Sequence, residues 1–207
     1  MRYISLALLL SAALLLQAPA AQAIPMTFGG NLSGANEVPP VNTPGTGTVR
    51  VVLDPTAQTL ELAVTFSNLT SLDTAAHIHC CAPLGTNVGI ATALPALPGF
   101  PLMVTSGTFD QTFSLTSAAF YNPAFITANG GTVAGAEAAL VAGIENTQAY
   151  FNIHTTINPG GEVRSQLFPA PEPASLVLLG SALFGVGLMR RRKTNRQPCS
   201  DIGSGQQ

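Results

Sequence analysis

Residues 59–66 read TLELAVTF, and this stretch carries the clearest fold signal in the chain. Apolar side chains occupy every second position, at Leu60, Leu62, Val64 and Phe66. Successive side chains of an extended strand point to opposite faces, so this alternation places all four apolar groups on one side. The stretch predicts a β-strand with one buried face.

Six further stretches share this alternation or a β-branched composition, at 26–32, 47–53, 75–79, 108–115, 149–154 and 162–168. Gly, Pro, Asn and Asp cluster between them, which is typical of turns. About seven short strands separated by turn signals predict an all-β fold, an antiparallel Greek-key β-sandwich.

Two regions depart from the strand pattern. Residues 85–106 are rich in Pro and Gly and predict a long loop. Between 117 and 146, apolar residues recur near helical spacing, and Asn129-Gly130-Gly131 precedes the best of these repeats. We expect a small helical insertion that covers one end of the sandwich.

The predicted domain, residues 24–169, is one ordinary domain of roughly 146 residues. It contains two arginines, no lysine and eight acidic residues, a formal net charge of about −6. Such a surface repels phosphate backbones, so we expect no nucleic-acid partner. Cations are better suited to it.

The N-terminal segment indicates export. Arg2 precedes an apolar run from Ile4 to Leu16, and Ala21-Gln22-Ala23 follows it. A basic start, a short apolar core and an A-x-A site are the layout of a secretory signal peptide, predicted at 1–23. The alternative is a membrane anchor, for which the run falls short of the ~20 residues that span a bilayer.

The C-terminal segment has a second targeting layout. Pro171-Glu172-Pro173 is followed by an uncharged apolar run at 174–189 and then by Arg190, Arg191, Arg192 and Lys193. A run this short, about 24 Å as a helix, suits a transient hydrophobic anchor, and a permanent single span is the alternative. We assign 170–193 as a sorting or anchor segment and 194–207 as a polar tail.

The three histidines of the chain are the main chemical candidates. His77 and His79 stand two apart in HIHCC, so on a strand both point to one face. His154 lies in NIHT on another predicted strand. If the intervening Ile78 and Ile153 face the core, all three imidazoles point outward or into a surface cleft.

Neutral imidazoles in such a cluster can bind a metal ion, and they suit one Zn or Cu ion. The alternative is that each histidine only bonds to backbone or water. A fourth ligand could come from Cys80, Cys81, Glu37, Glu162 or water. The adjacent Cys80 and Cys81 are weaker candidates, since they form either a vicinal disulfide or two free thiols.

Catalytic motifs are scarce in this sequence. The domain has no serine in a nucleophile-elbow motif and no phosphate-cradling Gly-rich loop before a helix. The sequence therefore predicts a non-enzyme, with metal-centred or acid–base activity open only through the histidines.

Five short motifs in series resemble the CHRD domain, which is named from chordin. They are LSGANEVPPV at 32–41, TGT at 46–48, HIH at 77–79, YFNIHT at 150–155 and NPGGEVRSQL at 158–167. The resemblance covers nearly all of 28–168 and implies a β-rich extracellular module whose recurrent histidine positions are 77, 79 and 154. Cys80-Cys81 replaces the more usual Gly-Pro after HIH.

The C-terminal layout resembles the PEP-CTERM sorting signal of bacterial envelope proteins. This resemblance implies processing near Pro171, Glu172 and Pro173 by an exosortase-type membrane protease, and an association with extracellular polysaccharide. We therefore expect an exported binding or structural module of the cell envelope or extracellular matrix, whose partners are polysaccharide or surface proteins. The alternative is a small metalloprotein at the histidine site, with redox or dismutase-like activity.

Overall fold

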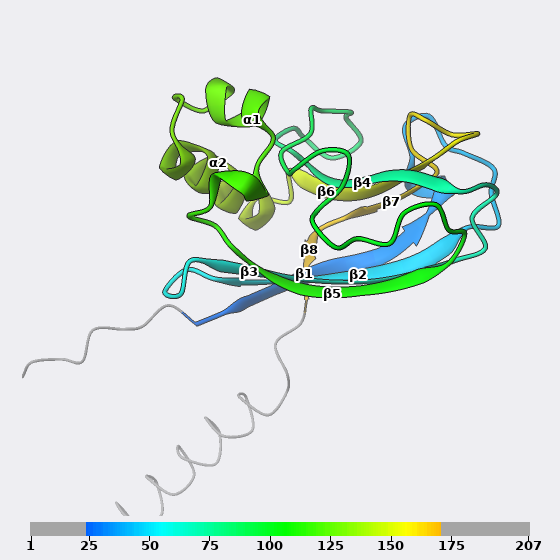
Figure 1. Ribbon diagram of the computed structural model, residues 1–207, viewed down its shortest axis with the longest axis horizontal. Helices are drawn as coiled ribbons and strands as arrows, with labels where there is room; N and C mark the ends of the chain where they lie inside the picture. The colour runs from blue at the N-terminus through cyan, green and yellow to red at the C-terminus, as the bar shows by residue number, and fades with distance from the viewer. Residues whose placement is uncertain (1–23, 171–207) are drawn as a thin grey trace, which may run out of the picture.

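The computed structural model describes residues 24–170, which form one antiparallel β-sheet with two short helices (Figure 1). The strands are β1 (Met26–Ser33), β2 (Thr46–Asp54), β3 (Thr59–Ser67), β4 (Asp73–Cys80), β5 (Gly107–Ser114), β6 (Ala149–Thr155), β7 (Val163–Gln166) and β8 (Phe168–Pro169). The predicted strands are confirmed, mostly to within two residues at each end. The last predicted stretch is divided into β7 and β8.

The sheet order is β4-β6-β7-β1-β2-β3-β5, and β8 pairs with β1 beside this path. The sheet curls, so that β4, β6 and β7 form one layer over a second layer of β1, β2, β3 and β5 (Figure 1). The predicted all-β antiparallel fold is confirmed, and its two layers belong to one continuous curled sheet.

The core fills the space between the layers. The four alternating apolar residues of β3 are all at most 3% exposed. Across from them, Ile78 on β4 and both Phe151 and Ile153 on β6 are fully buried. Phe100 and Leu97, from the long loop, join the same cluster. The buried core therefore lies within the segment 28–167.

The helices lie at one end of the curled sheet, as expected (Figure 1). They are α1 (Pro123–Ala128) and α2 (Val133–Glu145), with 3-10 turns η1 (Gly34–Asn36) and η2 (Ala118–Phe120) elsewhere. The N-cap of α2 is Thr132, whose side chain accepts a hydrogen bond from the Gly135 amide. Gly130 and Gly131 have positive φ and form the turn before this cap.

The region 85–106 contains no regular helix or strand, as predicted. Part of it runs beside β4, with bridges from Ile90 to His79 and from Ala96 to Ala76. This segment thus covers an edge of the sheet that would otherwise offer unpaired backbone groups.

The predicted signal peptide (1–23), the apolar C-terminal segment and the polar tail lie outside the described residues. Within 24–170, the structure contains no helix long and apolar enough to span a membrane.

Gly143 on α2 gives a stability test of the helix–sheet contact. A Cβ at this position would collide with the sulfur atoms of Cys80 and Cys81. We therefore expect Gly143→Ala to lower the free energy of unfolding by about 1–3 kcal/mol, although alanine is favoured over glycine in helices by about 1 kcal/mol. Urea denaturation measures the change.

The matched control is Ala142→Gly, at the exposed neighbouring position. It should cost only the helix-propensity difference of about 1 kcal/mol. A Gly143→Ala protein more stable than the parent would show that α2 does not pack tightly on the sulfur atoms of Cys80 and Cys81.

Candidate metal centre

One face of the β4-β6-β7 layer carries a concentrated set of polar side chains. The pairing register places His79 opposite Tyr150 and His77 opposite Asn152, while Asn152 also faces Arg164 of β7. His154 follows two residues after Asn152 and shares its face. The apolar side chains between them turn to the core, so alternation alone gathers these groups.

This polar face is buried. His77, His79 and His154 are 3%, 6% and 9% exposed. The expectation that they point outward or into a surface cleft is corrected here: they lie on the outer face of their layer, but loops close over it. The Val88 and Pro159 carbonyls contact two of the rings, and Glu37 lies against Asn152.

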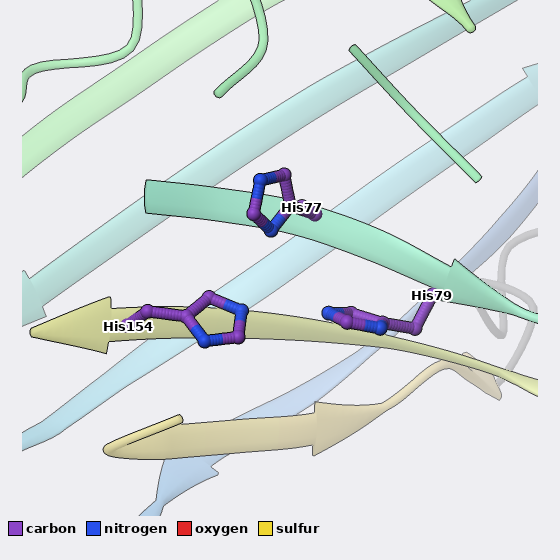
Figure 2. Close-up of side chains that lie close together, drawn as sticks. All are labelled: His77, His79 and His154. Carbon is purple, nitrogen blue, oxygen red and sulfur yellow. The ribbon is translucent and has the colours of Figure 1, made fainter. Parts of the chain in front are cut away.

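The three imidazoles converge. Figure 2 shows the rings of His77 and His79, from β4, and of His154, from the neighbouring β6, directed toward one another. One nitrogen from each ring can be chosen so that all three lie within 4.8 Å of one another. The pairing of β4 with β6 therefore brings together all the histidines that the sequence singled out.

Two of the rings are held in a defined tautomer. The Nδ1 of His79 lies 2.8 Å from the Val88 carbonyl oxygen, and the Nδ1 of His154 lies 3.0 Å from that of Pro159. A carbonyl oxygen only accepts, so each Nδ1 must carry the proton. The Nε2 of each ring then carries a free lone pair, and both Nε2 atoms are buried without a partner among the described residues.

The environment keeps the imidazoles neutral. Burial lowers the pKa of His77 to about 4, with further lowering by His154 and His79. Burial also lowers the pKa of His79 to about 4, and it lowers that of His154. The Pro95 carbonyl opposes the shift at His77 only weakly, since it does not meet hydrogen-bond geometry with either ring nitrogen. Neutral imidazole is the form that binds metals.

The other ligand candidates do not join the cluster. Cys80 and Cys81 form a disulfide, so neither offers a thiolate in this state. Glu162 accepts hydrogen bonds from Thr43, Thr70, Thr155 and Asn158. Among the described residues, the grouping of potential ligands contains only the three histidines.

Glu37 is buried at 5% exposure beside Asn152. Its Oε1 and the Oδ1 of Asn152 have no hydrogen-bond partner among the described residues. Burial raises the pKa of Glu37 to about 7, although Arg164 and the hydrogen bond from Asn152 act in the opposite direction. This carboxyl group is therefore partly protonated near neutral pH.

Sequence reasoning missed the role of Arg164. In the structure Arg164 stacks on Tyr150, with its Cζ 3.3 Å from the ring centroid. Tyr150 lies four residues before His154 on β6, so the two share a strand face, and this periodicity is the sequence signal that links Tyr150 to the histidines.

The chain matches the family model of the CHRD domain over residues 28–167. It belongs to the CHRD family. The PEP-CTERM protein-sorting motif matches residues 169–193. No curated protein and no solved structure matches the chain. The CHRD match spans every residue of the histidine centre.

The two matches place this CHRD protein among exported proteins of the bacterial envelope. The sorting motif is recognised by an exosortase, which is a membrane protease. The residues of that motif, including Pro171, Glu172, Pro173 and the basic residues from Arg190 to Arg192, lie outside the described segment.

The buried titratable groups predict how stability depends on pH in the metal-free CHRD domain. The folded pKa of His77 and His79, about 4, lies below the ordinary value of 6.5, so their contribution to stability is lost as pH falls from 6.5 toward 4. The folded pKa of Glu37, about 7, lies above its ordinary 4.5, so its contribution is lost as pH rises through this window.

These contributions oppose each other between pH 4.5 and 6.5. We expect the Glu37→Gln protein, which lacks the opposing group, to lose stability more steeply on acidification than the parent does. Urea denaturation at pH 7, 6, 5 and 4.5 measures both slopes. Equal slopes would show that Glu37 titrates normally in the folded domain.

Proposed function

We propose that this exported CHRD domain acts by binding and that His77, His79 and His154 bind a single transition-metal ion. The observation that carries the proposal is the convergence of three neutral imidazoles on one buried point. Two of them are fixed by backbone carbonyls so that their Nε2 lone pairs are free.

The unpartnered buried atoms support this proposal. Buried polar groups in folded proteins nearly always have a partner, so an exception calls for an explanation such as a bound ion or water. Eight buried side-chain atoms in the described residues have none, and four of these are ring nitrogens of the three histidines. A metal ion would satisfy one nitrogen on each ring at once.

The donor set limits the ion. Three imidazoles without thiolate or carboxylate suit Zn or Cu better than Ca or Mg, which prefer oxygen. Tetrahedral Zn–N bonds of about 2.0–2.1 Å would place the nitrogens about 3.3 Å apart, so the three nitrogens, which lie within 4.8 Å of one another, would have to approach by small side-chain rotations. Water would then complete the coordination.

The burial of the site favours binding over turnover. A redox or dismutase-like activity is the second candidate for the same residues, since Cu can cycle between two oxidation states. The ring nitrogens without partners are buried, so a substrate reaches them only if the covering loops open. We therefore place metal-dependent binding at the cell envelope or in the extracellular matrix ahead of catalysis.

Metal analysis tests the site directly. We expect the domain, residues 24–170, to retain about one Zn or Cu per chain after dialysis against excess metal, and His154→Ala to retain almost none. Elemental analysis measures the ratio. Thermal unfolding provides a second measure, because an ion that binds the folded state raises the melting temperature.

The control for the metal test is Asp110→Asn, which removes an exposed acidic group of β5 far along the sheet from the histidines. It should bind metal as the parent does. Substoichiometric metal in the parent, unchanged by His77→Ala or His154→Ala, would overturn the proposal.

The sorting motif has its own test in the native host. We expect Glu172→Ala to prevent processing, so that the full C-terminal segment stays attached. Mass spectrometry of the envelope-associated protein measures this. Asp201→Asn, beyond the basic cluster, should be processed normally, and identical masses for Glu172→Ala and the parent would contradict the prediction.

A further inference from the structure

Arg164 is a buried cation whose guanidinium is held by hydrogen bonds and by contact with an aromatic ring. It is 2% exposed. Its Nη1 donates to Asn87 Oδ1 at 3.0 Å and its Nη2 to the Thr86 carbonyl at 3.1 Å. Its Cζ lies over the ring of Tyr150. These contacts require the planar guanidinium of arginine, which forms hydrogen bonds along its edge and stacks on its face. Lysine cannot reproduce them.

The contacts of Arg164 hold the loop that covers the histidines. Thr86 and Asn87 directly precede Val88, whose carbonyl accepts the hydrogen bond from His79 Nδ1. The Asn87 side chain also donates to the Val38 carbonyl at 2.6 Å, which joins this loop to the segment after η1. Arg164 thus fixes residues 86–88 over the metal centre.

Tyr150 forms a second connection between Arg164 and His79. The rings of Tyr150 and His79 stack with centroids 4.7 Å apart and planes 5° from parallel. The Tyr150 hydroxyl accepts a hydrogen bond from the Val88 amide at 3.2 Å. The Arg164 guanidinium, the Tyr150 ring and the His79 ring therefore form one stack. Val88 contacts both Tyr150 and His79.

We propose that Arg164 is the positioning residue of the metal centre: through Tyr150 and residues 86–88 it fixes the orientation and tautomer of His79. The expected effect on metal affinity rests on the proposed function: a ring held with its Nε2 directed at the site binds the ion more tightly. Outer groups that orient metal ligands commonly change affinity by about 10- to 100-fold.

The structure supplies an internal control for this role. His154 is held by the Pro159 carbonyl, which belongs to the turn between β6 and β7 and not to residues 86–88. Within the described residues, neither Arg164 nor Tyr150 donates a hydrogen bond to that carbonyl. Loss of Arg164 should therefore release His79 and leave His154 in place.

Nitrogen-15 NMR of the metal-free domain reads the tautomer of each histidine. We expect the Nδ1–H form at His79 and His154 in the parent. In Arg164→Gln, His79 should become a mixture of tautomers while His154 keeps the Nδ1–H form. Arg50→Gln, the other arginine of the domain, should leave both histidines unchanged. A single unchanged tautomer at His79 in Arg164→Gln would overturn the inference.

Asn87→Ala covers the case in which Arg164→Gln does not fold. Asn87 is exposed, and its replacement removes a contact of Arg164 without a change in the sheet. It should also mix the tautomers of His79 but not those of His154. A fixed His79 in this folded variant would likewise count against Arg164 as the positioning residue.

Metal affinity then separates this inference from the proposed function. Competition with a chelator should show Zn bound about 10- to 100-fold more weakly by Arg164→Gln or Asn87→Ala than by the parent. If the parent binds no metal but the tautomers respond as described, the metal proposal fails and the positioning of His79 by Arg164 stands. If the parent binds metal and both variants bind it equally well, the positioning inference fails alone.

Discussion

The structure depends on the fact that β6 has no exposed face. All seven of its residues are buried. One face, with Phe151 and Ile153, closes the apolar core. The other carries Tyr150, Asn152 and His154, and buried polar groups are costly unless they have partners. The loops at 34–45 and 84–98 therefore do more than connect strands, because they bring carbonyls and side chains to this second face.

Two charged residues of the motif NPGGEVRSQL, Glu162 and Arg164, lie on the two sides of the histidine centre. Arg164 fixes the loop at 86–88 beside His79. Burial alone would raise the pKa of Glu162, but hydrogen bonds from Thr155, Thr43 and Thr70 lower it, so the carboxylate is charged. Glu162 also accepts from Asn158, next to the Pro159 carbonyl that holds His154. Each charge thus stabilises the turn that orients one histidine.

The parts of this arrangement that sequence could predict are those set by local periodicity. Alternation located the strands and placed His77 and His79 on one face, because a strand repeats every two residues. The meeting of both with His154 depends on β4 pairing with β6, although β4 ends at Cys80 and β6 begins only at Ala149. Local periodicity does not specify which distant strands pair. Burial of the trio and the stacking of Arg164 come from loops, whose course no repeat predicts.

The same alternation also decides which chemistry the centre can have. Cys80 follows His79 directly, so it faces the core, where it is 4% exposed and bonded to Cys81. Sulfur is thereby kept on the opposite side of β4 from the imidazoles. The carboxylate of Glu162 is occupied by hydroxyl and amide donors. A set of three neutral nitrogen donors remains, which favours a borderline ion such as Zn or Cu over softer or harder ones.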